Sequence, residues 1–97
     1  METMLSPLQS GLMDKLNVYP NPFTSRISLE VSSLYNENAI VSMVDSQEKI
    51  IKMFSWYLKT GTNKTSLDGL ASLPSGTYRI ILKDTSGTAI GDVSITK

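Results

Sequence analysis

The sequence predicts an all-β protein, folded as an immunoglobulin-like antiparallel β-sandwich of about seven strands. Three observations lead to this fold class. Short runs rich in Ile, Val and Leu recur at fairly even spacing and are separated by turn residues, a rhythm typical of sandwiches and small barrels. The clearest runs alternate apolar and polar residues, which is typical of a strand with one buried and one solvated face. Apart from a weak helical turn at residues 8–16, no stretch of the chain has the periodicity that predicts a helix.

The first strand is expected at residues 16–19 and the second at residues 26–32. The first ends at a proline, which cannot continue a central strand because it has no backbone N–H. In the second, Ile27, Leu29 and Val31 alternate with polar residues. These three side chains should therefore face the core.

The third and fourth strands are expected at residues 39–45 and 49–58, joined by a tight connection. Val41 and Met43 are the expected core residues of the third strand. The fourth run is long for a strand, so a bend or bulge is expected near Ser55.

The last three strands are expected at residues 64–67, 77–83 and 89–96. The turns before and between them, at residues 60–63 and 84–87, contain Gly together with Thr, Asn, Asp or Ser, which favour tight reversals. The last two strands have core residues that follow the two-residue alternation. They are Tyr78, Ile80, Leu82, Val93 and Ile95.

The length of 97 residues is enough for one domain with one core, and too short for an additional large active-site cavity. We assign residues 15–97 to the β-sandwich. Residues 1–14 mix Ser, Pro, Gln and Gly with isolated Leu and Met, and we interpret them as a linker or lead-in. They contain neither the basic region nor the continuous apolar region of a secretion signal.

The composition argues against several classes of partner and site. Nine basic and nine acidic residues give a formal net charge of zero, with no block of like charge. This balance argues against binding to nucleic acid or to an anionic membrane surface. Because the chain has no Cys and no His, disulfides and thiolate or imidazole metal sites are excluded. No apolar stretch approaches the roughly 18 residues that span a bilayer, so no membrane insertion is expected. The domain is expected to be a monomer.

No catalytic residues, metal or cofactor are expected. Four aspartates lie at strand ends or turns, where Asp commonly bonds the local backbone, and they lack the Asp-x-Asp-x-Asp spacing of a calcium loop. They are Asp45, Asp68, Asp84 and Asp92. The many serines have no His or Cys partner, and the glycines occur singly rather than in a phosphate-binding loop. The chain is therefore predicted not to be an enzyme.

Two short motifs stand out from this background. In the first, Val18 and Tyr19 precede the run Pro20-Asn21-Pro22. Each proline holds φ near about −65° and removes a backbone donor, so the run should form a rigid corner after the first strand. Asn21 should bond nearby backbone, as Asn commonly does in turns.

The second motif is Leu73-Pro74-Ser75-Gly76-Thr77-Tyr78. Leu73 should close one end of the sandwich, Pro74 should preset a turn, and Gly76 should supply a backbone conformation that other residues resist. Tyr78 should pack inward while its hydroxyl bonds a backbone partner.

In combination the motifs resemble the C-terminal sorting domain, type A, of type IX (Por) secretion cargo proteins from Bacteroidota. The resemblance covers nearly the whole chain, in the family's order. Its blocks are residues 17–22, 41–45, 61–63 with Leu67, 73–78 and 95–97. The chain departs from the family pattern where Val44 replaces the usual aromatic residue, where Gln47 or Glu48 replaces the usual Gly, and where a single lysine ends the sequence.

The resemblance implies a non-catalytic secretion signal. In the family, the domain follows a larger cargo protein and directs it through the periplasm and the type IX system to the cell surface or the medium. The implied partners are the system's outer-membrane shuttle protein and its sortase-like peptidase, with cleavage before the domain. The residues expected to be recognised belong to the two motifs and the last strand. They are Val18, Tyr19, Pro20, Asn21, Pro22, Leu73, Pro74, Gly76, Tyr78, Val93, Ile95 and Lys97.

The main alternative is a non-catalytic carbohydrate-binding or adhesive sandwich. Trp56 and Tyr57 would be its contact residues, because aromatic faces stack on sugars. Neighbouring residues of a strand point to opposite faces, so one ring covering the core and one exposed ring is the simpler interpretation.

Overall fold

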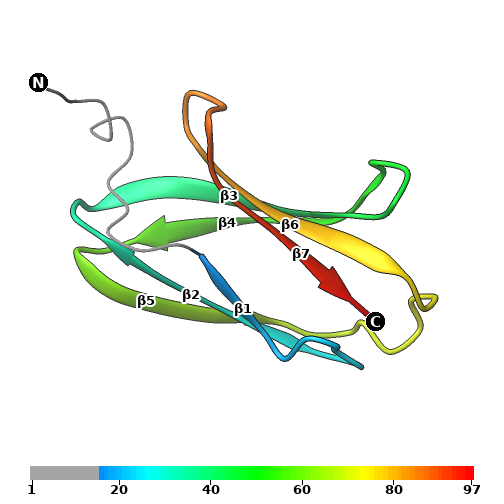
Figure 1. Ribbon diagram of the computed structural model, residues 1–97. Coiled ribbons are helices and arrows are strands. Elements are labelled where there is room, and N and C mark those ends of the chain that lie inside the picture. The colour runs from blue at the N-terminus through cyan, green and yellow to red at the C-terminus, as the bar shows by residue number, and fades with distance from the viewer. Residues whose placement is uncertain (1–15) are drawn as a thin grey trace, which may run out of the picture.

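The computed structural model of the protein describes residues 16–97, which fold into seven strands. The strands form two layers packed face to face (Figure 1). They are β1 (Asn17–Tyr19), β2 (Ile27–Ser33), β3 (Glu37–Val44), β4 (Ile50–Leu58), β5 (Gly61–Leu67), β6 (Thr77–Asp84) and β7 (Ala89–Thr96). The predicted all-β sandwich is confirmed. The linker expected at residues 1–14 lies outside the described residues.

One layer is a three-stranded sheet in the order β1-β2-β5, and the other is a four-stranded sheet in the order β4-β3-β6-β7. Neighbouring strands run antiparallel throughout. β1 and β7 are edge strands of different sheets, and they contact each other on one side of the sandwich (Figure 1). No helix in the described part of the chain is long and apolar enough to cross a membrane.

The core between the sheets is built from the alternating faces that the sequence predicts. Ile27, Leu29 and Val31 of β2 are at most 2% exposed. The facing sheet contributes further buried side chains from all four of its strands, with Leu58 of β4 among them. Each fully buried aliphatic or aromatic residue contributes roughly 1.5–3 kcal/mol to stability. The buried side chains of the facing sheet also include Val41, Met43, Tyr78, Ile80, Leu82 and Ile95. Val93 is half-buried and packs against this cluster.

The predicted boundaries differ most at β5, which begins at Gly61 rather than at residue 64. The sequence placed Asn63 in a turn because Asn favours turns. In the structure its side chain holds the turn while its backbone pairs with Val31 of β2. Asn63 Oδ1 accepts the Lys59 N–H at 2.8 Å, and Nδ2 donates to the Lys59 carbonyl oxygen at 2.8 Å.

The irregularity expected near Ser55 lies elsewhere. Met43 pairs with Lys52, and the next residue of β3, Val44, pairs with Ile50, so Ile51 is an extra residue opposite the end of β3. A bulge of this kind re-aims side chains. Val44 keeps its outer-face position opposite Arg79, outside the core cluster, and is buried there at 4% exposure. The bulge adjoins a tight turn, where strand pairing ends.

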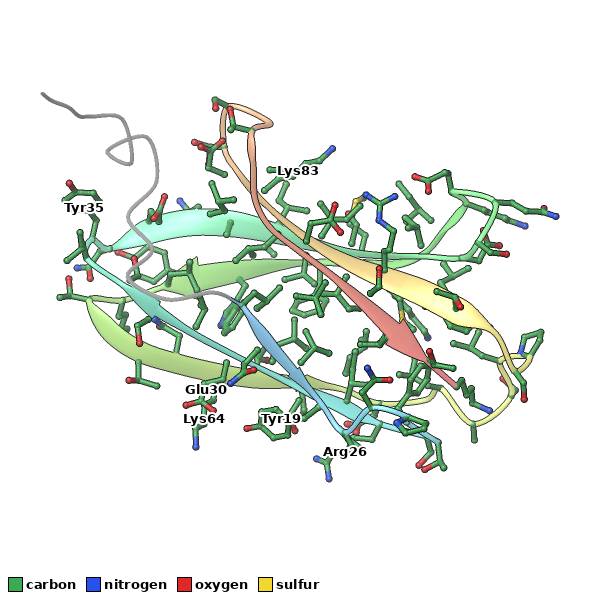
Figure 2. The ribbon with its side chains drawn as sticks, in the orientation of Figure 1. Tyr19, Arg26, Glu30, Tyr35, Lys64 and Lys83 are labelled. Atoms are coloured by element: carbon green, nitrogen blue, oxygen red, sulfur yellow. The ribbon has the colours of Figure 1, made fainter. Side chains whose placement is uncertain are left out.

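The outer face of the three-stranded sheet is polar. Figure 2 shows Tyr19, Glu30 and Lys64 close together on this side of the molecule. The Tyr19 hydroxyl donates to Glu30 Oε1 at 3.2 Å, and Glu30 lies directly opposite Lys64 in the β2–β5 register. Opposite charges at facing positions favour this register modestly.

Candidate functional site

Three segments that are far apart in the sequence meet at one end of the sandwich. They are the corner at residues 20–23, the loop at residues 73–78 and the end of the chain at residues 95–97 (Figure 1). We call this region the motif end. Backbone hydrogen bonds join all three segments, and Phe23 and Tyr78 pack beneath them.

The corner holds the end of β7 through Thr96. The Thr96 N–H donates to Asn21 Oδ1 at 2.9 Å, and the Thr96 carbonyl oxygen accepts the Phe23 N–H at 2.9 Å. Asn21 was expected to bond nearby backbone, but its partner is 75 residues later in the sequence. The corner therefore acts as a tertiary contact that ties β7 to the other sheet.

The loop holds the next residue, Lys97. The Lys97 N–H donates to the Gly76 carbonyl oxygen at 2.9 Å, and the Gly76 N–H donates to the Lys97 carbonyl oxygen at 3.1 Å. This reciprocal pair extends the β6–β7 ladder past the end of the assigned strands. The Lys97 Nζ also donates to the Ala71 carbonyl oxygen at 3.2 Å.

Two aromatic rings support the motif end from inside. Phe23 is 1% exposed, and its ring meets that of Tyr78 edge to face, with centroids 5.8 Å apart and planes at 68°. The Tyr78 hydroxyl donates to the Pro74 carbonyl oxygen at 2.5 Å. The expectations that Tyr78 packs inward and bonds the backbone are both confirmed.

The predicted recognition residues divide into two groups. Five are buried or half-buried and pack in or against the core: Val18, Leu73, Tyr78, Val93 and Ile95. Seven are exposed or half-exposed at the surface: Tyr19, Pro20, Asn21, Pro22, Pro74, Gly76 and Lys97. All except Val18, Tyr19 and Val93 fall within the motif end. The first group packs beneath the second and supports it from inside.

Three residues in or next to the motif end were missed by sequence reasoning. Phe23 and Leu70 are almost fully buried, and Leu70 closes the end of the core more completely than Leu73, which is only half-buried. A large apolar residue in a segment expected to be loop is a signal of burial that could have identified both. Thr96 gives no such signal, because only its backbone takes part.

The free edge of β7 adjoins the motif end. Among residues 16–97, only β6 pairs with β7. The backbone groups of Thr96 point away from β6, toward the corner. Because backbone direction alternates along an antiparallel strand, the groups of Ser94 and Asp92 point the same way. Within residues 16–97, this edge of β7 is thus bonded at Thr96 and unpaired before it.

An ion-pair network fixes the turn between β3 and β4. Arg79 Nη1 lies 2.7 Å from Glu48 Oε2, and Arg79 Nη2 lies 2.7 Å from Asp92 Oδ2. The hydrogen bonds that Arg79 donates to Asp92 and Glu48 raise the pKa of Arg79, and the bond from Arg79 lowers the pKa of Asp92. Glu48 has φ of 67°, a left-handed conformation that favours Gly. It is one of the two positions at which the resemblance implies Gly.

The exposed groups around the motif end are available for contact with a partner. No group of His, Cys, Asp and Glu side chains within residues 16–97 could hold a metal ion. Trp56 is buried at 9% exposure whereas Tyr57 is 52% exposed, so the two rings present no shared stacking face. Within the described part of the chain, the motif end and the adjoining edge of β7 present exposed side chains and unpaired backbone groups that a partner could contact.

A comparison with protein-family models decides the family. The model for the secretion system C-terminal sorting domain matches residues 17–96, nearly all of the chain. The chain belongs to this family. It is a type IX secretion sorting domain, as the two motifs indicated. A type IX sorting domain implies export across the cell envelope. A search of curated proteins found no matching sequence.

A solved structure supports the fold independently. The crystal structure of the Bifidobacterium adolescentis GH3 beta-glucosidase matches 86% of this sorting domain with a TM-score of 0.51 and 13% sequence identity. The match spans only 16% of the glucosidase chain. At this identity the likeness concerns the fold alone.

Proposed function

We propose that the domain directs an attached cargo protein through the type IX secretion system to the cell surface or the medium, and that it does so as an address rather than a catalyst. The recognising partners are the outer-membrane shuttle protein and the sortase-like peptidase of that system. Residues 15–97 form the address, and residues 1–14 link it to the cargo.

The observation that carries this proposal is the convergence of the family's motifs at one end of the sandwich. The Pro20-Asn21-Pro22 corner and Gly76 both bond the backbone of the last two residues. A receptor that docks there contacts all three segments as one surface. This surface exists only when the domain has folded, because folding brings the three segments together. Recognition of this kind selects folded cargo domains over unfolded ones.

The edge of β7 supports a second mode of contact. An extended receptor segment can add to an open sheet edge through main-chain hydrogen bonds. Ser94 and Asp92 offer their backbone groups on that edge, whereas those of Thr96 are already bonded. Strand addition therefore begins upstream of the motif end, and the corner limits how far the incoming strand can extend.

Export of a reporter tests the proposal. The full chain is fused behind a reporter carrying a general secretory signal peptide and expressed in a type IX-competent host and in its translocon-deficient derivative. The reporter should reach the surface or medium only in the competent host. Deleting Ile95 to Lys97 should leave it in the periplasm.

Because the deletion removes the buried Ile95 and could unfold the domain, a matched pair of surface variants accompanies it. Thr24→Arg adds bulk and charge to an exposed position beside Phe23, whereas Thr85→Arg makes the same change in the exposed β6–β7 turn, at the other end of β7. Thr24→Arg should reduce export and Thr85→Arg should not. Equal export of both, or normal export of the deletion, would contradict recognition at the motif end.

A further inference from the structure

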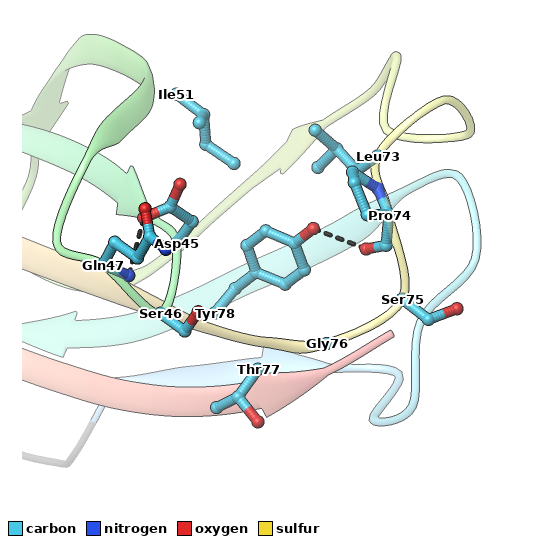
Figure 3. Close-up of a pocket in the computed structure, with 10 residues that line it drawn as sticks. All are labelled: Asp45, Ser46, Gln47, Ile51, Leu73, Pro74, Ser75, Gly76, Thr77 and Tyr78. Carbon is cyan, nitrogen blue, oxygen red and sulfur yellow. Dashed lines mark hydrogen bonds between the residues drawn. The ribbon is translucent and has the colours of Figure 1, made fainter.

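A pocket opens at one side of the motif end, between the Asp45–Gln47 turn and the loop at residues 73–78 (Figure 3). Its volume is about 280 Å³, just below the range of about 300–1,000 Å³ typical of small-molecule sites. That size suits one side chain of a partner protein better than a cofactor. Ile51, the extra residue of the bulge, lies on one wall.

The pocket has an apolar wall and a carboxylate. Leu73 and Pro74 lie at one end, Asp45 lies at the other, and the Tyr78 ring lies between them (Figure 3). Asp45 Oδ1 accepts the N–H groups of Gln47 and Lys49, each at 2.9 Å. Among residues 16–97 no hydrogen bond or salt bridge engages the second oxygen, Oδ2, although Asp45 is half-buried.

The neighbouring carboxylate is already neutralised. Glu48 lies in the same turn but is paired with Arg79, which also fixes the turn against β6. Arg79 points to Glu48 and Asp92 and does not line the pocket. Asp45 is the one carboxylate among the lining residues, and no basic side chain is among them.

From this charge and shape we propose that the pocket receives a lysine or arginine side chain of the protein that recognises the domain. The aliphatic stem of that side chain lies along Ile51, Leu73 and Tyr78, and its charged group bonds Asp45 Oδ2. Long basic side chains commonly combine apolar contact along the stem with a polar contact at the tip. The inference rests on the proposed function, since it names the chemistry of a recognising partner.

Titration followed by NMR tests the pocket without the partner. The probe is N-acetyl-lysine methylamide, and the matched control is N-acetyl-norleucine methylamide, which has the same aliphatic stem but no charge. The lysine probe should give saturable amide shifts at Ser46, Gln47 and Thr77. The norleucine probe should bind up to about fivefold more weakly, the upper end of the range for a partly exposed charge pair.

Two variants of the chain complete the test. Asp45→Asn retains an oxygen for the turn hydrogen bonds but loses the charge, so it should weaken the lysine probe by up to about fivefold. Asp68→Asn removes a carboxylate whose partner is Arg26, outside the pocket, and should leave affinity unchanged. Equal binding of the two probes, unchanged affinity in Asp45→Asn, or no saturable shifts with either probe would overturn the inference.

The export assay separates this inference from the proposed function. Asp45→Asn should reduce export of the reporter. If the full chain is exported, Thr24→Arg is retained and Asp45→Asn is exported normally, the pocket inference fails and the sorting function stands. If the full chain is not exported at all, the proposed function fails, and the titration alone then decides the chemistry of the pocket.

Discussion

The contact between Asn21 and Thr96 leads to the sharpest prediction, because it joins a corner motif to the last strand. Asn21→Ala removes the side-chain oxygen that accepts the Thr96 N–H at 2.9 Å. A hydrogen bond of this kind contributes about 0.5–1.5 kcal/mol to the free energy of unfolding. Asn21 is exposed, so water can replace it at the freed N–H, and the cost should lie at about 0.5–1 kcal/mol.

Thermal unfolding and amide exchange measure this effect. In a domain of this size 1 kcal/mol lowers Tm by roughly 4–8 °C, so Asn21→Ala should show a fall of at most that amount. Protection of the Thr96 amide should fall as well, while that of the Phe23 amide, which donates to the Thr96 carbonyl oxygen at 2.9 Å, should fall less. This pattern would locate the loss at the corner.

Two controls make the result decisive. Asn21→Asp retains an oxygen acceptor and should keep the Thr96 amide protected. Asn38→Ala changes an exposed Asn on β3 and should shift stability by no more than about 0.5 kcal/mol. Unchanged Thr96 protection in Asn21→Ala would refute the view that the corner side chain holds the last strand.

Three further predictions concern the turns and the motif end. Glu48 has φ of 67°, a conformation that strains Ala but not Gly, and both Glu48→Gly and Glu48→Ala lose the pair with Arg79. Glu48→Gly should therefore be about 1 kcal/mol more stable than Glu48→Ala in urea unfolding. Equal urea midpoints of the two variants would contradict this. Tyr78→Phe keeps the ring against Phe23 but loses the hydrogen bond to Pro74, so it should lower the free energy of unfolding by about 1 kcal/mol. Tyr78→Ala also removes the ring and should lower it by roughly 3–5 kcal/mol. Comparable losses in the two variants would mean that the ring contributes little to stability. The Ser86 hydrogen bond lowers the pKa of Asp84 below its ordinary value of 3.8, so the ionised Asp84 stabilises the fold above about pH 3.8, and this stabilisation is lost as the pH falls through the lower pKa of the folded state. The urea midpoint should therefore fall less between pH 6 and pH 2 in Asp84→Asn than in the parent chain. Identical falls in the two proteins would argue against the lowered pKa.

Much of the fold was predictable because strand patterning is local. The alternation of Ile27, Leu29 and Val31 identifies a buried face without knowledge of what covers it. The bulge at Ile51 and the early start of β5 were not predictable, because each depends on how two strands meet at a turn. The alternation rule also explains why Trp56 and Tyr57 diverge, one into the core and one into solvent.

For the candidate site, the two motifs and their resemblance to the sorting-domain family could be recognised from residue types and order alone. The contact between the two motifs and the end of the chain could not be predicted in this way. Asn21 and Thr96 become neighbours only because β1 and β7 lie at the same side of two different sheets, and the pocket at Asp45 exists only because the turn after β3 faces the loop before β6. Such contacts depend on sheet order and on backbone direction, which side-chain patterning along the chain does not specify.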